Sequence, residues 1–284
     1  EQDFFTDVVD DTTKLELSIF LDTEFQQLDL DTNIPICFQA LISFNLNNKN
    51  YRFLMIAYDI SLKNDDLYKS KYKNLDLYKF YIDLKNQTKD YHLLNCFLKV
   101  FFNEYDFKLT NLNKLHFSTN IYFYFSLKDL NISLGSQNMK DIYTGKKKST
   151  LKQYNSVQGS FDVLLDQFRH NVSFSVKLKD LFGINTQGLQ SLAESYEIDF
   201  KKSALLEPFK SEMTKALSLY PLEFENYALE DCLVLEPILE KYVFSSNNIL
   251  KEVFYIEDET AFYSLKSIPL TVGYLVYSFY KKFS

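Results

Sequence analysis

The sequence predicts an α/β protein with a mixed sheet and helices on the faces of that sheet. Apolar residues alternate with a period of two in Leu15–Asp22, as they do in a strand, and two further strand segments follow within the first sixty residues. A helix-spaced segment and a further strand pattern follow at residues 91–102 and 114–125. Helical patterns then recur toward the C-terminus, so neither an all-α nor an all-β fold fits.

The N-terminal part reads as three consecutive strands. Apolar residues fall on the odd positions of Leu15–Asp22, which predicts the first strand. Ile36–Leu46 is the second, and the polar turn at 47–50 leads into the third, Tyr51–Tyr58. Strands that follow one another through short polar turns are typical of an antiparallel meander.

The middle of the chain alternates polar connectors with regular elements. Residues 60–90 and 135–160 are polar and are predicted as insertions or loops. Between them, the apolar spacing of 91–102 predicts a helix and 114–125 a strand. Ser126 follows that strand and is suited to cap a helix through "LKDLNISL".

Helices dominate the C-terminal part. We expect one at 187–197 and one that opens at Pro221, a favoured first-turn residue. The second helix should kink or break near Pro237. The segment "TVGYLVYSFYKKF" fits a helix or a strand equally well. We predict a single domain across residues 1–284, with a C-terminal extension at 244–284.

Composition narrows the class of protein. A net charge of −7 argues against a duplex-DNA binder that relies mainly on phosphate neutralisation. The three cysteines, Cys37, Cys96 and Cys232, form no disulfide or zinc spacing, which predicts a reducing, intracellular compartment. No apolar run reaches the roughly 18 residues of a membrane helix and no signal peptide is visible, so we expect no membrane association. The abundance of Phe, Tyr, Asn, Lys and Ile favours an AT-rich genome, such as that of an organelle (mitochondrion or plastid) or a plasmid.

A pair of acids ends the first strand. Asp22 and Glu24 are two residues apart in "SIFLDTEFQQ", so on a strand they share one face. Two neighbouring carboxylates repel unless a cation or a proton lies between them. The pair is therefore a candidate magnesium site, and its simpler interpretation is a solvated strand end.

A tyrosine and an aspartate share one face of the helix that opens at Pro221. Tyr227 and Asp231 are four residues apart in "ENYALEDCLVL" and can offer a hydroxyl and a metal ligand to one place. Taken alone, such a pair is more typical of an ordinary helix surface.

Taken in this order, "FLDTEF" and "YALEDCLVL" resemble the first and third motifs of the DEDD, or DnaQ-like, 3′–5′ exonucleases. Tyr227 is similar to the tyrosine of the DEDDy branch, which includes the proofreading domains of family A and family B DNA polymerases and the ribonuclease D-like enzymes. In "IYFYFSLKDLNISLG", Asp129 resembles the second-motif aspartate in the variant seen in plasmid and organellar polymerases. Asp106 in "FFNEYDF" is the alternative candidate for the second-motif aspartate. The resemblance spans residues 15–284 and implies a ribonuclease H-like fold.

The resemblance implies a two-metal site. Asp22, Glu24 and Asp231 would bind one Mg²⁺ or Mn²⁺, Asp22 would bridge to a second ion, and Asp129 would complete the site. Tyr227 would orient the attacking water. The implied substrate is a single-stranded or frayed DNA 3′ end. The alternatives are a stand-alone ribonuclease D-like enzyme acting on RNA and a non-catalytic nucleic-acid-binding or scaffold module of the same fold.

A polymerase partner is a further expectation. The chain begins at Glu1 rather than Met, and "SLYP" lacks the aspartate of a polymerase motif, so we expect a fragment whose polymerase domain is encoded downstream. The lysines of 146–148 and 201–202 could touch phosphates, although such runs more often lie in solvated loops. Phe25 could stack on a base, although core packing is the simpler interpretation.

Overall fold

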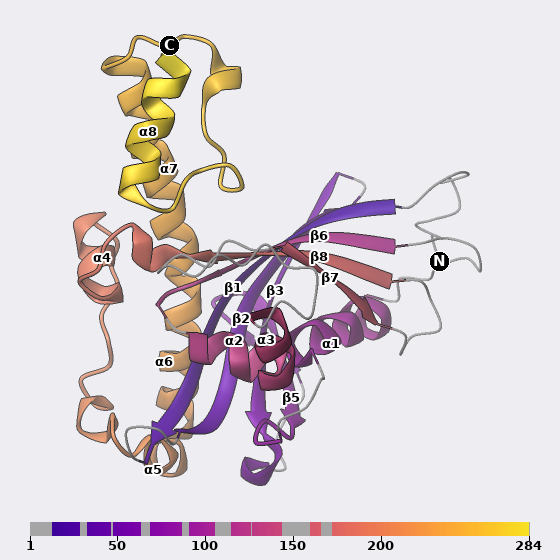
Figure 1. Ribbon diagram of the computed structural model, residues 1–284. Coiled ribbons are helices and arrows are strands. Elements are labelled where there is room, and N and C mark those ends of the chain that lie inside the picture. The colour runs from indigo at the N-terminus through magenta and orange to yellow at the C-terminus, as the bar shows by residue number, and fades with distance from the viewer. Residues whose placement is uncertain are drawn as a thin grey trace.

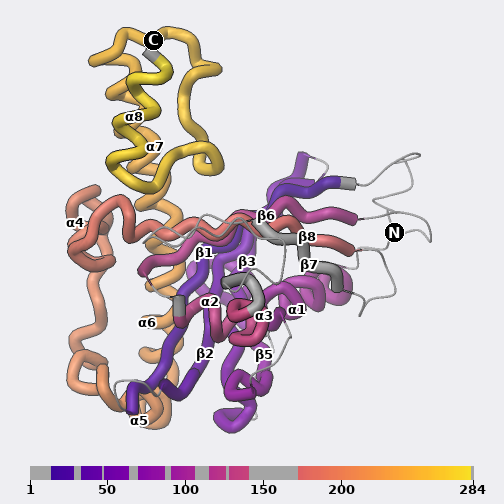
Figure 2. Tube along the Cα trace, in the orientation of Figure 1, coloured from indigo at the N-terminus to yellow at the C-terminus, as the bar shows by residue number. Residues whose placement is uncertain are grey.

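The fold is a large mixed sheet with helices on both faces (Figure 1). The computed structural model describes residues 13–28, 33–46, 48–63, 69–86, 91–105, 115–125, 127–143, 160–165 and 172–283. The sheet has eight strands in the order β4-β5-β3-β2-β1-β6-β8-β7. The C-terminal helices α7 and α8 extend beyond the sheet, as the tube in Figure 2 shows.

The centre of the sheet has the predicted ribonuclease H-like arrangement. β1 (Thr13–Gln27), β2 (Asn33–Leu46) and β3 (Lys49–Asp59) pair antiparallel and confirm the meander. β6 (Leu115–Phe123) then pairs parallel with β1, and β8 (Val172–Asp180) pairs parallel with β6. The α/β mixed sheet expected from the sequence is thus the fold of the chain.

The prediction of a polar connector at 60–90 is wrong in part. After the short 3-10 helix η1 (Ile60–Leu62), β4 (Lys69–Tyr72) and β5 (Leu75–Ile82) form a hairpin, and β5 pairs parallel with β3. Lys73 and Asn74 make its two-residue turn, both with positive φ (48° and 67°). The usual Asn-Gly signal of such a turn is missing, so the hairpin is hard to recognise in the sequence.

The prediction of a loop at 135–160 is also wrong at its start, where α3 (Ser136–Tyr143) forms a helix; residues 144–159 lie outside the described chain. β7 (Ser160–Leu165) pairs antiparallel with β8 at the sheet edge. The predicted helix at 91–102 begins as α1 (His92–Lys99) and continues as a π-helical turn. The helix predicted in "LKDLNISL" is α2 (Leu127–Leu134).

Helices make up most of the C-terminal part, as predicted. They are η3 (Leu181–Gly183), α4 (Leu189–Ser195), η4 (Glu207–Phe209), α5 (Met213–Leu219), α6 (Pro221–Leu233), α7 (Leu235–Glu252), η5 (Glu259–Ala261) and α8 (Val272–Phe283). The break between α6 and α7 falls at Val234, and Pro237 lies in the first turn of α7, where its missing N–H is not needed. The closing segment, which fitted either element, is helical. Among the described residues, no helix is both long enough and apolar enough to cross a membrane.

The core has one layer on each face of the sheet. The odd-numbered apolar residues of β1 pack against α1 and α2, where Phe97 and Phe174 flank Phe117 at ring distances of 5.1 and 4.9 Å. The even-numbered Phe20 belongs to the other layer, which α6 covers. Side chains alternate along a strand, so Asp22 and Glu24 face α6 and Thr23 faces α2.

Candidate metal centre

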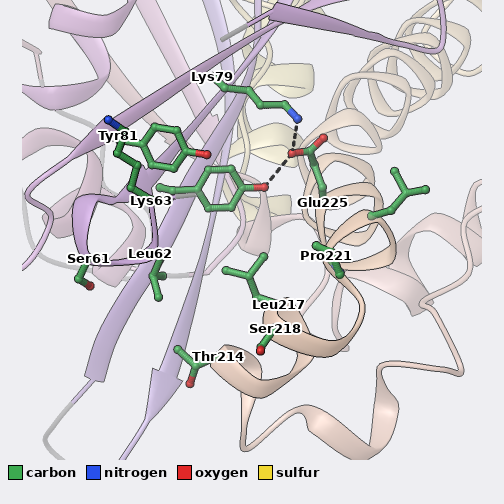
Figure 3. A pocket seen from close by; sticks show the side chains of 12 residues that line it. Ser61, Leu62, Lys63, Lys79, Tyr81, Thr214, Leu217, Ser218, Pro221 and Glu225 are labelled. Carbon is green, nitrogen blue, oxygen red and sulfur yellow. Dashed lines mark hydrogen bonds and ion pairs between the residues drawn. The ribbon is translucent and has the colours of Figure 1, made fainter. Parts of the chain in front are cut away.

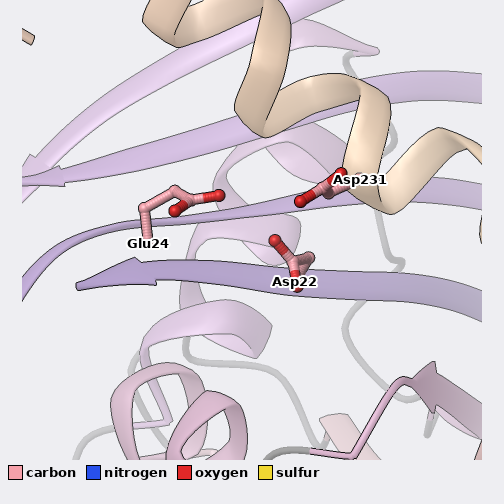
Figure 4. A group of neighbouring side chains, drawn as sticks. All are labelled: Asp22, Glu24 and Asp231. Carbon is pink, nitrogen blue, oxygen red and sulfur yellow. The ribbon is translucent and has the colours of Figure 1, made fainter. Parts of the chain in front are cut away.

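Three acids from two distant segments meet between β1 and α6. Asp22 and Glu24 lie on β1, opposite Gln39 and Cys37 of β2, just before a register shift at Glu24/Phe25. Asp231 lies on the buried face of α6. Each of the three acids offers an oxygen that lies within 4.8 Å of the other two, and Figure 4 shows the carboxylates pointing toward one another. The sequence-predicted trio therefore forms one cluster.

The cluster is poorly solvated. Glu24 is 8% exposed and Asp231 is 5% exposed, whereas Asp22 retains partial exposure and opens the cluster to solvent. Burial, followed by repulsion from Asp231 and Asp129, raises the pKa of Asp22 well above its usual range. Burial and repulsion from Asp231 likewise raise the pKa of Glu24 well above its usual range. A divalent cation would remove this repulsion directly.

Tyr227 and Lys202 border the cluster. The Lys202 Nζ donates to Asp231 Oδ2 at 2.9 Å and to the Tyr227 hydroxyl at 3.2 Å, and it lies 5.2 Å from the centre of the tyrosine ring. Burial alone would lower the pKa of Lys202, but the charges and hydrogen bonds of Asp231 and Tyr227 together outweigh burial and raise it. Burial raises the pKa of Tyr227, so its phenol stays protonated at neutral pH.

Gln39 fixes the orientation of Asp22. Its Nε2 donates to Asp22 Oδ2 at 2.7 Å, while its Oε1 accepts from the Cys37 thiol at 3.5 Å. The side chain is fully buried in an otherwise apolar stretch of β2. A lone amide in the run "ICFQALISF" is the signal in the sequence that could have pointed to Gln39. The sequence also did not predict that Lys202 borders the acids, because a pair of lysines in an irregular segment is typical of a solvated loop.

Asp129 approaches from the other face of β1. It lies in the first turn of α2, is 2% exposed, and accepts a hydrogen bond from Thr23 Oγ1. Among the described residues it stays outside the group that converges within 4.8 Å. Its charge nevertheless raises the pKa of both Asp22 and Glu24, so it is an electrostatic neighbour of the cluster. Asp106, the alternative candidate for the second-motif aspartate, lies outside the described residues.

Phe25 follows the cluster on β1. It is half-buried, and the Lys128 Nζ lies 4.8 Å from the centre of its ring. Both core packing and base stacking therefore remain compatible with its position.

No protein-family model matches the chain, and no curated protein is significantly similar to it.

The acids fit a hard divalent cation. Their donors are all carboxylate oxygens, the ligand type that Mg²⁺ and Mn²⁺ prefer. Asp231 Oδ1 is buried, and within the described part of the chain it has no hydrogen-bond partner. An acceptor buried in this way is costly unless something binds it. The donor set and this oxygen together fit a divalent cation.

Proposed function

We propose that the chain is a metal-dependent 3′–5′ exonuclease that hydrolyses the terminal phosphodiester bond of a DNA strand. The observation that carries the proposal is the convergence of Asp22, Glu24 and Asp231 beside the Tyr227 phenol. The resemblance of the three sequence motifs to the DEDDy enzymes supports the same chemistry. By that resemblance, the domain acts in proofreading beside a family B polymerase.

Four acids would hold the metals. Asp22, Glu24 and Asp231 are suited to one ion; by the resemblance Asp129 would complete the site, although it lies on the other face of β1, where it accepts from Thr23. When bound, two such ions would supply a water of lowered pKa and would stabilise the attacking and leaving oxygens of the displacement. The repulsion that raises the pKa values of Asp22 and Glu24 favours cation binding for the same reason.

The remaining residues orient the reacting groups. The Tyr227 hydroxyl positions the attacking water and keeps its own proton, since burial raises its pKa. Lys202 holds Tyr227 and Asp231 at fixed positions, and Gln39 holds Asp22. The products are a nucleoside monophosphate and a strand one nucleotide shorter.

A single-stranded end fits the site better than a paired end. Glu24 and Asp231 are buried between a strand and a helix, and a duplex is too wide to enter that space. The 3′ end must therefore be unpaired or frayed before it reaches the acids.

The test uses 5′-labelled single-stranded DNA and the matching RNA. With Mg²⁺ or Mn²⁺, the wild type should shorten the DNA from its 3′ end in steps of one nucleotide, and a chelator should stop the reaction. Asp22→Asn keeps the shape of the side chain but removes a ligand charge, so its rate should fall to the chelator background. Asp199→Asn, an exposed aspartate outside the cluster, should leave the rate unchanged.

The outcomes separate the three candidate functions. Preference for the RNA strand would favour a ribonuclease D-like enzyme over a proofreading domain. Binding without any shortening would favour a non-catalytic module. Equal rates for wild type and Asp22→Asn would rule out this site as the source of activity.

A further inference from the structure

A second feature of the α6 face of the sheet is a cavity of about 680 Å³. It lies between η1, the neighbouring strands β3 and β5, and helices α5 and α6 (Figure 3). Its lining includes Tyr58, Lys63, Lys79, Tyr81, Thr214 and Glu225. The volume is in the range of small-molecule sites, and the lining combines aromatic rings with charged and hydroxyl groups.

The strand register connects the cavity to the acids. Glu24 pairs with Cys37, Cys37 pairs with Tyr58, and Tyr58 pairs with Tyr81. These residues form one row across four neighbouring strands. At about 4.8 Å per strand, Tyr58 lies about 10 Å from Glu24 and Tyr81 about 14 Å from it. The row places Tyr81 three strands from the acid cluster on the same face of the sheet, and its middle members, Cys37 and Tyr58, are buried.

Buried interactions fix the inner wall of the cavity. Glu225 accepts from the Tyr58 hydroxyl and pairs with the Lys79 Nζ, both at 2.9 Å, as the dashed lines in Figure 3 show. The side chains of Lys79 and Glu225 are each only 14% exposed. The charge of Lys79 is thus compensated by Glu225, and the Tyr58 ring is held in place.

The outer wall presents an aromatic ring and a cation. Tyr81 stacks on Tyr58 with ring centres 5.9 Å apart and an interplanar angle of 24°, and it keeps partial exposure. Lys63 is exposed at the end of η1. A ring that is supported from behind, together with a nearby ammonium group, is the combination that binds single-stranded nucleic acids: the base stacks and the phosphate pairs.

We propose that this cavity binds a base of the single-stranded substrate upstream of its 3′ end. The base stacks on Tyr81, and Lys63 contacts a backbone phosphate. At a stacked rise of about 3.4 Å per nucleotide, the distance of about 14 Å from Glu24 to Tyr81 corresponds to about four steps, which places the bound base about four nucleotides upstream of the 3′-terminal one. This proposal rests on the proposed function. It adds a second contact between the chain and the single-stranded substrate, apart from the acid cluster.

The test compares short and long substrates. For a decanucleotide, Tyr81→Leu should raise the KM about tenfold, because the stacked base is lost, and should leave kcat unchanged. Hydrolysis of a dinucleotide, which does not reach the cavity, should be unaffected. Tyr81→Phe keeps the ring and should behave as the wild type.

Lys63→Gln gives a second measurement that does not depend on core packing. Since Lys63 is exposed, this variant should fold normally, raise the KM of the decanucleotide and reduce the dependence of that KM on salt. Lys251→Gln, an exposed lysine at the end of α7, is the matched control and should change neither value.

Equilibrium binding separates the failure of this proposal from that of the proposed function. The anisotropy of a labelled decanucleotide, measured with chelator, should report weaker binding by Tyr81→Leu. Nuclease activity with unchanged KM and unchanged binding would overturn the cavity assignment and leave the exonuclease standing. Binding that depends on Tyr81 without any nuclease activity would overturn the exonuclease. If Tyr81→Leu changes only inhibition by a nucleoside monophosphate, the cavity is a product site and the proposal is wrong.

Discussion

Lys202 shows how one residue can set the geometry of an acidic site. It donates to both Tyr227 and Asp231, which lie one turn apart on α6. The contact with Asp231 is charge-assisted, and such hydrogen bonds are about twice as strong as neutral ones. Lys202 therefore holds the phenol and one carboxylate in a fixed relation while it offsets part of the negative charge.

Replacement of Lys202 should impair turnover more than substrate binding. In Lys202→Met the two contacts are lost, so we expect kcat to fall by about 10- to 100-fold, the equivalent of about 1.5–3 kcal/mol for a hydrogen bond to a charged group. KM should change little. Steady-state kinetics on single-stranded DNA measure both values.

The neighbouring lysine provides the control for that variant. Lys201 is exposed, and Lys201→Met removes the same charge from the adjacent position. An equal loss of kcat in both variants would show that general electrostatic attraction, and not the contacts of Lys202, is responsible.

At the scale of elements, α6 determines whether the site forms. It carries Tyr227 and Asp231, and its inner face packs Phe224, Ala228 and Cys232 into the core. Ion pairs hold the helices against β5, the turn of the β4–β5 hairpin and β3: Glu225 pairs with Lys79, Glu230 with Lys73, and Glu236 with Arg52. The acids therefore meet only if this helix packs in the correct register against β1 and β2.

Truncation of a core residue of α6 should destabilise the fold and disturb the site together. Phe224 is fully buried, so Phe224→Ala should lower the free energy of unfolding by about 3–5 kcal/mol. Leu222, on the same helix, is 64% exposed, and Leu222→Ala should change the free energy of unfolding by less than about 0.5 kcal/mol. Urea denaturation measures both; similar effects of the two variants would show that α6 is not packed as described.

At the scale of the whole molecule, the acid cluster links stability to pH and to metal. The pKa values of Asp22, Glu24 and Asp231 are raised in the folded chain, chiefly by burial. The folded state thus binds more protons than the unfolded state at pH values above the ordinary carboxyl pKa of about 4. Without metal, this contribution to stability is present at acidic pH and is lost as the pH rises through the folded pKa values.

The expected result is a difference between two stability curves. With chelator, the free energy of unfolding of the wild type should fall from about pH 4 toward neutral pH more steeply than that of Asp22→Asn, which has one acid fewer. Mg²⁺ at about 100 times its Kd should restore about 2.7 kcal/mol to the wild type at neutral pH and less to the variant. Parallel curves with no effect of Mg²⁺ would contradict a cation site in this cluster.

The sequence determines the elements that have a regular apolar pattern. The period-two run at Leu15–Asp22 predicted β1, the apolar segments that follow predicted β2, β3 and β6, and the segment that opens at Pro221 predicted α6. The spacing of the residues in the sequence also placed Asp22 and Glu24 on one face of a strand, and Tyr227 and Asp231 on one face of a helix. These features are local, because side-chain direction repeats with the backbone period. The hairpin β4–β5 was missed because its turn lacks glycine.

Only the tertiary structure decided which distant residues meet. The packing of α6 brings Asp231 beside Asp22 across more than two hundred positions of sequence, and an irregular segment brings Lys202 to the same place. The structure also puts Asp129 on the opposite face of β1 and places the row from Glu24 to Tyr81 beside a cavity. Contacts of this kind depend on how whole faces pack, and a polar residue without a periodic pattern carries no sign of the partner that it will meet.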